Sequence, residues 1–294
     1  MKTRASEISI SGFTIVRNAV KLNYPFRESV LSVLPLCDEF IINIGDSEDE
    51  TAEIAEALRV EFPQKIRLIH SKWERKNQQG GFQLKHQTDR AIQSCRGNWC
   101  FYIQADEAIH EADYPRIQKA VSEAHQQTRV DGVLFDYLHF YGNYDYSIHG
   151  RNWYRREVRL FKNFRGISSF RDAQGFRRDE QRLFVKPSGA RVFHYGYVRT
   201  PSSLEEKSKN MSLWWGTQPD ASDSAFRLHR HVGLTRFEGT HPGVMKSKVE
   251  NQPKFDPSQC PRKWDWTEIK NAMTLVWDQF FNFRLGEFRN YEIV

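Results

Sequence analysis

Two adjacent carboxylates, Asp106 and Glu107, follow the short apolar segment Phe101–Ile103. A short apolar run of this kind predicts a buried strand, so both carboxylates stand just beyond a strand end. Carboxylate oxygens are the ligands that Mg²⁺ and Mn²⁺ prefer, and such an ion can bridge a carboxylate to a diphosphate. The same pair could instead be solvated and cap the helix that follows. By itself, the motif leaves both interpretations open.

The elements around this motif alternate between strand and helix patterns. Apolar or β-branched runs predict strands over residues 8–16, 40–44, 65–70 and 99–103, and helical spacing predicts helices over 26–34 and 83–94. Repeated units of this length predict an α/β fold with a mostly parallel sheet flanked by helices. Ligands of such sheets bind at the carboxyl ends of the strands. We therefore expect the polar turns after Val16, Ile44 and Ile103 to meet at one edge.

Composition restricts the classes of protein that fit. The chain has 294 residues, 27% of them charged, with a formal net charge of +6, and no block of like charges. These values favour a folded protein with a mildly basic surface over a dedicated nucleic-acid tail. The four cysteines show no zinc-binding spacing, which favours reduced thiols. No apolar run has the length of a signal peptide or a membrane span, so we expect a cytoplasmic protein.

The pattern changes in the second half of the chain. Further strands are expected over residues 132–139 and 157–161, and residues 142–153 are expected to form a loop. Helical spacing over 204–215 and 266–283 predicts a mainly helical C-terminal extension of residues 201–294, packed on a catalytic domain of residues 1–200. Aromatic side chains are frequent there. Trp214 and Trp215 could stack on an acceptor sugar or pack between helices. The last helix could dock on the domain or contact a membrane surface.

Four motifs follow one another along the chain: Val16–Ala19 after the first strand, the acidic turn Gly45–Thr51, the step Gly97–Trp99, and Gln104–Glu107. As an ordered set, they resemble the family 2 glycosyltransferases, which have the GT-A fold with its Rossmann-like sheet. The resemblance covers roughly residues 8–200 and extends to enzymes that modify bacterial lipopolysaccharide and other cell-surface polysaccharides. It implies a nucleotide-sugar part of about residues 1–110 and an acceptor part of about residues 111–200.

The resemblance also implies site residues. The donor-binding set it suggests comprises Val16, Asn18, Asp46, Lys85, Asp89 and Gln104. Gln104 stands where the family often has the first aspartate of its D-x-D motif. Asp106 would then be the principal ligand of a Mn²⁺ or Mg²⁺ ion, with His194 completing the metal site. Capping of the next helix is an alternative role for Asp46, and solvation is one for Lys85.

Inverting transfer, which is usual in the family, needs a carboxylate that removes the proton of the acceptor hydroxyl. The resemblance places this base in the loop of residues 169–180, where Asp172 is the first candidate and Asp179 the second. Arginines flank both, so surface ion pairs are an alternative. Arg171, next to Asp172, argues mildly against it because a neighbouring cation lowers the pKa of a carboxyl group.

The sequence therefore predicts a metal-assisted, inverting hexosyl or related transferase. Its partners would be a nucleoside-diphosphate sugar donor and a glycan or lipid-linked acceptor, with peripheral contact at the inner face of the membrane and no nucleic acid. A sugar-phosphate nucleotidyltransferase is one alternative, although residues 17–20 lack the glycine- and lysine-rich phosphate loop that it needs. A basic, aromatic nucleic-acid-binding module is another, although no zinc spacing or basic recognition helix supports it.

Overall fold

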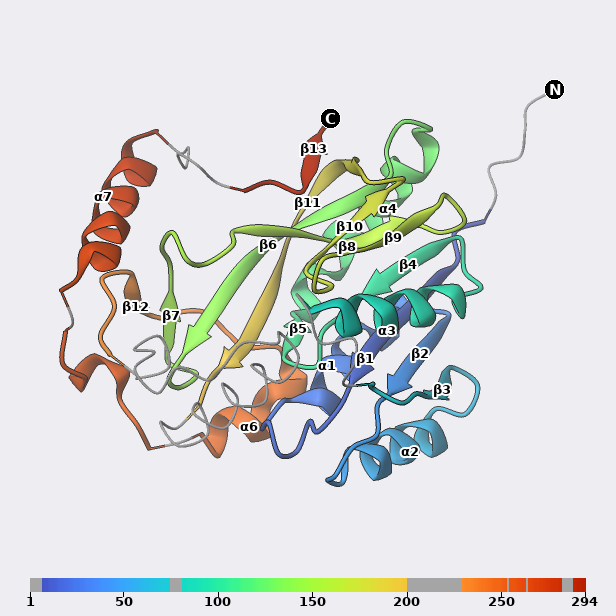
Figure 1. Cartoon of the computed structure of the whole chain (residues 1–294), viewed down its shortest axis with the longest axis horizontal. Coiled ribbons are helices and arrows are strands. Elements are labelled where there is room, and N and C mark those ends of the chain that lie inside the picture. The colour runs from blue at the N-terminus through green and yellow to red at the C-terminus, as the bar shows by residue number, and fades with distance from the viewer. Residues whose placement is uncertain (1–6, 75–80, 200–228, 253, 263, 282–287) are drawn as a thin grey trace.

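The computed structural model describes residues 7–74, 81–199, 229–252, 254–262, 264–281 and 288–294 (Figure 1). The expected helix over residues 204–215, with Trp214 and Trp215, lies outside this part. The main elements are β1 (Ile10–Val16), α1 (Phe26–Val33), β2 (Glu39–Ile44), α2 (Thr51–Glu61), β3 (Ile66–His70), α3 (Phe82–Gln93), β4 (Trp99–Tyr102), β5 (Glu107–Ile109), α4 (Tyr114–Gln126), β6 (Gly132–Tyr141), β7 (Tyr146–Ile148), β8 (Arg156–Lys162), β9 (Ile167–Phe170), β10 (Gly175–Arg178), β11 (Gln181–Tyr197), β12 (Leu234–Arg236), α6 (Lys246–Glu250), α7 (Trp266–Phe281) and β13 (Tyr291–Ile293).

The α/β class is confirmed, and the sheet has the order β3-β2-β1-β4-β8-β6-β11-β10-β9. Its first four strands are parallel, as predicted, with Val16 beside Ile44 at the carboxyl ends of β1 and β2. Parallel pairing does not extend through the rest of the sheet. Strand β8 runs antiparallel to both β4 and β6, and β9 and β10 form an antiparallel hairpin. The sheet is therefore mixed. After α4, short connections join antiparallel strands, whereas parallel strands would need helical crossovers.

Both faces of the sheet are covered, so side chains that alternate along a strand enter different cores. Phe40 and Ile42 of β2 pack with α1, α2 and α4, whereas Ile41 packs with α3 on the opposite face. The β9–β10 hairpin covers that second face beside α3 through Phe176. This hairpin matters for the site because its turn carries Asp172.

Two local expectations need correction. Helix α2 begins at Thr51, and the side chain of Asp49 accepts hydrogen bonds from the Thr51 N–H and hydroxyl. Asp46 therefore does not cap it, because it lies too far before the first turn of the helix. Residues 142–153, expected as a loop, contain the short strand β7, which pairs with β6 and β12. The pairing with β12 depends on residues about ninety positions away, which local patterns do not reveal.

None of the helices in the described part of the chain combines the length and the apolarity that a membrane span requires.

Candidate functional site

A cavity of about 340 Å³ opens where the parallel strands end. Its walls come from the ends of β1 and β4, the β9–β10 turn and the end of β11, which meet there because of the sheet order. The lining residues are Ile15, Val16, Arg17, Leu22, Tyr24, Trp73, Leu84, Tyr102, Gln104, Ala105, Asp106, Tyr154, Asp172, Ala173, Gln174, His194 and Tyr197. The structure thus brings Val16, Gln104, Asp106, Asp172 and His194, which were singled out in separate motifs, to one cavity.

The adjacent carboxylates Asp106 and Glu107 have different environments. Asp106 lines the cavity, whereas Glu107 is completely buried behind it. Both carboxylate oxygens of Glu107 accept hydrogen bonds from the guanidinium group of Arg159, and Oε1 also accepts one from the Tyr137 hydroxyl. This buried charge is therefore paired, as burial requires. Glu107 supports the site structurally, and Asp106 is the carboxylate left to meet a ligand.

Asp106 faces His194 across a small gap. Asp106 Oδ2 lies 3.7 Å from His194 Nε2. Two ligands of one octahedral ion, each ~2.1 Å from it, are about 3–4 Å apart, so the spacing suits a shared cation. A Cβ atom at Gly196 would lie 2.5 Å from Asp106 Oδ2 and 2.8 Å from His194 Nε2. Glycine at this position therefore keeps open the space in which an ion would sit.

The orientation of the His194 ring is set by His139, which the sequence analysis did not single out. His139 Nε2 lies 2.8 Å from the carbonyl oxygen of Tyr154, and its Nδ1 lies 3.0 Å from His194 Nδ1. A carbonyl oxygen only accepts, so His139 Nε2 carries a proton. In the neutral pair, His194 Nδ1 must then donate to His139 Nδ1. The lone pair of His194 Nε2 consequently faces the carboxylate of Asp106, an arrangement of two acceptors that suits a cation.

Asp172 reaches the cavity on the tight turn between β9 and β10. Its neighbours Arg171 and Ala173 have φ angles of 55° and 67°, an unusual conformation for residues other than glycine. Burial raises the pKa of Asp172, although the N–H of Gln174 and the charge of Arg171 oppose the shift. The Arg171 guanidinium lies over the rings of Phe170 and Phe288. The concern that this arginine would drive the pKa of Asp172 too low is therefore not supported.

Asp179, the second candidate base, lies elsewhere. It is exposed at the β10–β11 turn, has a φ of 48°, and is not among the cavity-lining residues. A different carboxyl group, Glu157, is buried behind the wall and accepts a hydrogen bond from the Gln174 side chain at 2.8 Å. Burial raises the pKa of Glu157 to about 8. The sequence offered no reason to expect Glu157 at the site, because a carboxylate within a strand normally faces solvent.

The other end of the cavity is shaped by Trp73 at the end of β3. Its backbone N–H donates to Asp46 Oδ1, and Arg17 Nε contacts the same oxygen at 3.3 Å. A Cβ atom at Gly45 would lie 2.6 Å from the Trp73 indole nitrogen, so glycine allows the ring to pack on the strand end. Asp46 itself is half-exposed and fixes two lining residues, rather than forming the wall. The rule that ligands bind at strand ends could have identified Trp73.

Besides Asp46, three predicted donor-binding residues are not among those that line the cavity. Asn18, buried and with a φ of 53°, accepts the Glu48 N–H and donates its own N–H to Ser47. Lys85 and Asp89 form an ion pair on α3, and both bind the backbone of Ser169 in β9. These contacts hold the acidic turn and the hairpin in place. Direct roles of the three residues in donor binding stay predictions.

Arg199 is a further charged residue beside the cavity that the sequence analysis missed. It is 1% exposed, its Nε donates to the carbonyl oxygen of Gly196, and its guanidinium group lies 5.0 Å from the ring of Tyr24, a lining residue. Both of its terminal nitrogens are buried without a hydrogen-bond partner in the structure as described. Unpaired buried donors are costly, so an anionic ligand in the cavity would suit this guanidinium group. In the sequence, the position of Arg199 five residues after His194 could have suggested that it lies near the site.

Comparison with known proteins gives partial structural likenesses only. No protein-family model matches the sequence, and no curated protein matches it. Among solved structures, S. aureus TarS is 15% identical, with 70% of this chain and 39% of that chain covered and a TM-score of 0.40. The mannosyltransferase PcManGT from Pyrobaculum calidifontis, in complex with GDP-Man and Mn²⁺, is 15% identical over 44% of this chain and 36% of that chain, with a TM-score of 0.35.

Glucosyl-3-phosphoglycerate synthase from Mycobacterium tuberculosis, in complex with Mn²⁺, UDP and phosphoglyceric acid, is 16% identical. The match covers 46% of this chain and 44% of that chain, with a TM-score of 0.31. The chain thus spans less than half the length of each of these three proteins. The likeness is limited, and the chemistry of the cavity has to be derived from its own side chains.

Proposed function

We propose that the chain is a metal-assisted glycosyltransferase of the GT-A type that uses a nucleoside-diphosphate sugar. The observation that supports this most is the meeting of Asp106, His194 and Asp172 in one cavity at the ends of the parallel strands. Such a cavity offers a cation site and a carboxylate base within one wall. The ion that fits Asp106 and His194 is Mn²⁺ or Mg²⁺, and when bound it neutralises charge that develops on a departing diphosphate.

The donor would lie along the cavity with its base near Trp73 and its diphosphate near Asp106. Trp73, Val16 and Arg17 offer an aromatic face, an apolar surface and a cation at one end. Arg199 supplies buried donors near the other end, where two phosphate groups would need them. The predicted roles of Asn18 and Asp46 in donor binding would then be indirect, through the turn that positions Arg17.

Asp172 would act as the base of an inverting transfer. The acceptor oxygen attacks the anomeric carbon, the bond from that carbon to the diphosphate oxygen breaks, and the hydroxyl proton passes to the Asp172 carboxylate. Its burial keeps the pKa above that of an ordinary aspartate, which makes the carboxylate a better proton acceptor. The two positive φ angles beside it hold the group at the wall, where strained turns commonly serve function.

Donor binding tests the proposal directly. Wild-type protein should be stabilised against thermal unfolding by one nucleoside diphosphate and its sugar, more strongly with Mn²⁺ than without it. Asp106→Asn should remove the effect of Mn²⁺, and Arg199→Gln should weaken binding with or without Mn²⁺. Asp179→Asn, which changes an exposed carboxylate outside the cavity, should behave as wild type. If no nucleoside diphosphate stabilises the wild-type protein, the proposed function is wrong.

The exposed face of α7 supports peripheral contact of the enzyme with a membrane that carries a lipid-linked acceptor. Six apolar side chains lie along it at helical spacing, each three or four residues from another of the set, and are 39–76% exposed: Trp266, Ile269, Met273, Val276, Trp277 and Phe280. Lys270 is exposed on the same helix, and the chain has a formal net charge of +6. A face with tryptophans and a flanking cation suits the interface of an anionic bilayer.

Flotation with phosphatidylglycerol vesicles tests this contact. The wild-type protein should float with the vesicles, and the double variant Trp266→Ser/Trp277→Ser should lose most of this binding. Phe164→Ser removes another exposed aromatic ring and should change nothing. A wild-type protein that stays in the unbound fraction, or whose α7 face instead pairs two copies in solution, would contradict membrane contact.

A further inference from the structure

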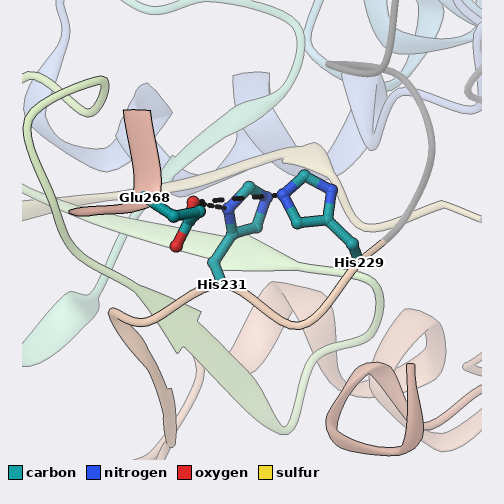
Figure 2. Close-up of side chains that lie close together, drawn as sticks. All are labelled: His229, His231 and Glu268. Carbon is teal, nitrogen blue, oxygen red and sulfur yellow. Dashed lines mark hydrogen bonds and ion pairs between the residues drawn. The ribbon is translucent and has the colours of Figure 1, made fainter. Parts of the chain in front are cut away.

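A second cluster of metal-ligating side chains lies away from the cavity, beneath α7. His229 and His231 come from the segment before β12, and Glu268 comes from the first turns of α7 (Figure 2). Both imidazoles face Glu268 of the helix (Figure 2). Their ligand atoms and those of Glu268 all lie within 4.8 Å of one another.

The distances within the cluster suit one small cation. Glu268 Oε1 lies 2.7 Å from His231 Nδ1 and 3.9 Å from His229 Nε2. Tetrahedral ligands that are each ~2.1 Å from a zinc ion are about 3.4 Å apart, between these two values. The two imidazole rings have their centroids 3.8 Å apart. Small shifts of side chains would therefore close the three ligands around an ion.

The hydrogen bonds that hold the Glu268 side chain resemble those around a metal-binding carboxylate. Glu268 is 3% exposed, and its second oxygen, Oε2, accepts the Val232 N–H at 2.9 Å. The side-chain amide of Asn271, one turn later in α7, lies 3.4 Å from Oε1 and accepts the Arg151 N–H through its own oxygen. Such outer hydrogen bonds fix the orientation of a ligand before an ion binds.

The way α7 is attached gives a physical reason for an ion at this place. A helix on a protein surface normally docks through an apolar stripe. On α7, the buried side chains among those described are the polar Glu268 and Asn271, while the apolar stripe faces outward. Among the side chains of α7 whose burial is described, no apolar one is fully buried, so polar contacts carry much of its docking there. A metal that joins Glu268 to His229 and His231 would supply the missing attachment.

We propose that His229, His231 and Glu268 bind one Zn²⁺ ion, which fastens α7 to the segment before β12. Two imidazoles and a carboxylate are a ligand set that zinc accepts, with a fourth position left for water or an exogenous ligand. The inference is independent of the proposed transfer reaction, because none of these three side chains lines the cavity.

Zinc titration after removal of metal with a chelator tests the proposal. To exclude binding at the cavity, the titration uses the double variant Asp106→Asn/His194→Ala as background. This protein should take up one Zn²⁺ per chain and unfold at a higher temperature with zinc. Adding His231→Ala or Glu268→Gln should weaken zinc affinity by more than the ~10–100-fold cost of losing an outer-shell partner.

The matched control is His70→Ala, which removes an exposed imidazole at the end of β3 and should leave zinc uptake unchanged. If the background protein takes up no stoichiometric zinc, the site does not exist, whatever the variants do. If uptake persists at full affinity in His231→Ala, the ion binds elsewhere and the proposal is equally overturned.

Discussion

The two histidine–carboxylate clusters of this molecule differ in what surrounds them. Asp106 and His194 face an open cavity, and His139 holds the imidazole from behind. His229 and His231, from the segment before β12, meet Glu268 of α7 on the other side. Metal sites that serve chemistry need space for substrate beside the ligands; Asp106 and His194 line such a space, and His229, His231 and Glu268 do not. Similar side chains can therefore serve different purposes. A cluster that adjoins a cavity can bind substrate, and one that lies between a helix and a loop can fasten the helix.

The largest effect should follow from Asp106→Asn. Loss of the cavity carboxylate removes a charge that holds the metal, so turnover should fall by about 10³-fold or more, consistent with the several kcal/mol that a metal contributes. Circular dichroism and zinc uptake at His229–His231–Glu268 should be unchanged. Sugar transfer at the wild-type rate would show that Asp106 does not hold a catalytic ion, and loss of zinc uptake would show that the two clusters are not separate.

Asp172→Asn should follow, with turnover reduced by about 10²–10⁴-fold, the usual contribution of a general base. Donor affinity, measured by titration calorimetry, should stay near the wild-type value. In the wild type, activity should fall as the pH decreases through the pKa of Asp172, which burial places above that of an ordinary aspartate. An unchanged rate in the variant would move the base to another group.

His139→Leu should give a smaller loss, because His139 orients a ligand and does not touch the ion. Removing an outer partner of a metal-binding histidine commonly costs about 10–100-fold in metal affinity. We expect the Mn²⁺ concentration for half-maximal activity to rise, with less change at saturating Mn²⁺. His139→Gln, whose amide can still bond to His194, should recover part of the affinity. Equal behaviour of both variants would mean that the histidine only packs.

A separate effect is expected on the pH dependence of stability, through Glu157. Its pKa of about 8 in the folded protein exceeds the unfolded value near 4.5, so the folded state holds more protons between these values. The free energy of unfolding should therefore decrease as the pH rises from about 4.5 to about 8, by at most ~1.4 kcal/mol per pH unit. Glu157→Gln should flatten this slope in urea unfolding, and Glu180→Gln, at an exposed turn, should not.

The sequence by itself predicted the α/β class, the four parallel strands and the motif that carries Asp106, because apolar periodicity and turn residues act locally. It also pointed to Asp172 and His194, although through a resemblance. Their direct roles stay predictions.

Only the tertiary structure separated Asp106 from its neighbour Glu107 and Asp172 from Asp179. The burial of a carboxylate depends on strands that are distant in the chain: Arg159 neutralises Glu107 from β8. His139 and Glu268 had no detectable signal for the same reason. Their partners lie 55 and 37 residues away along the chain, and contacts over such distances are decided when the elements pack.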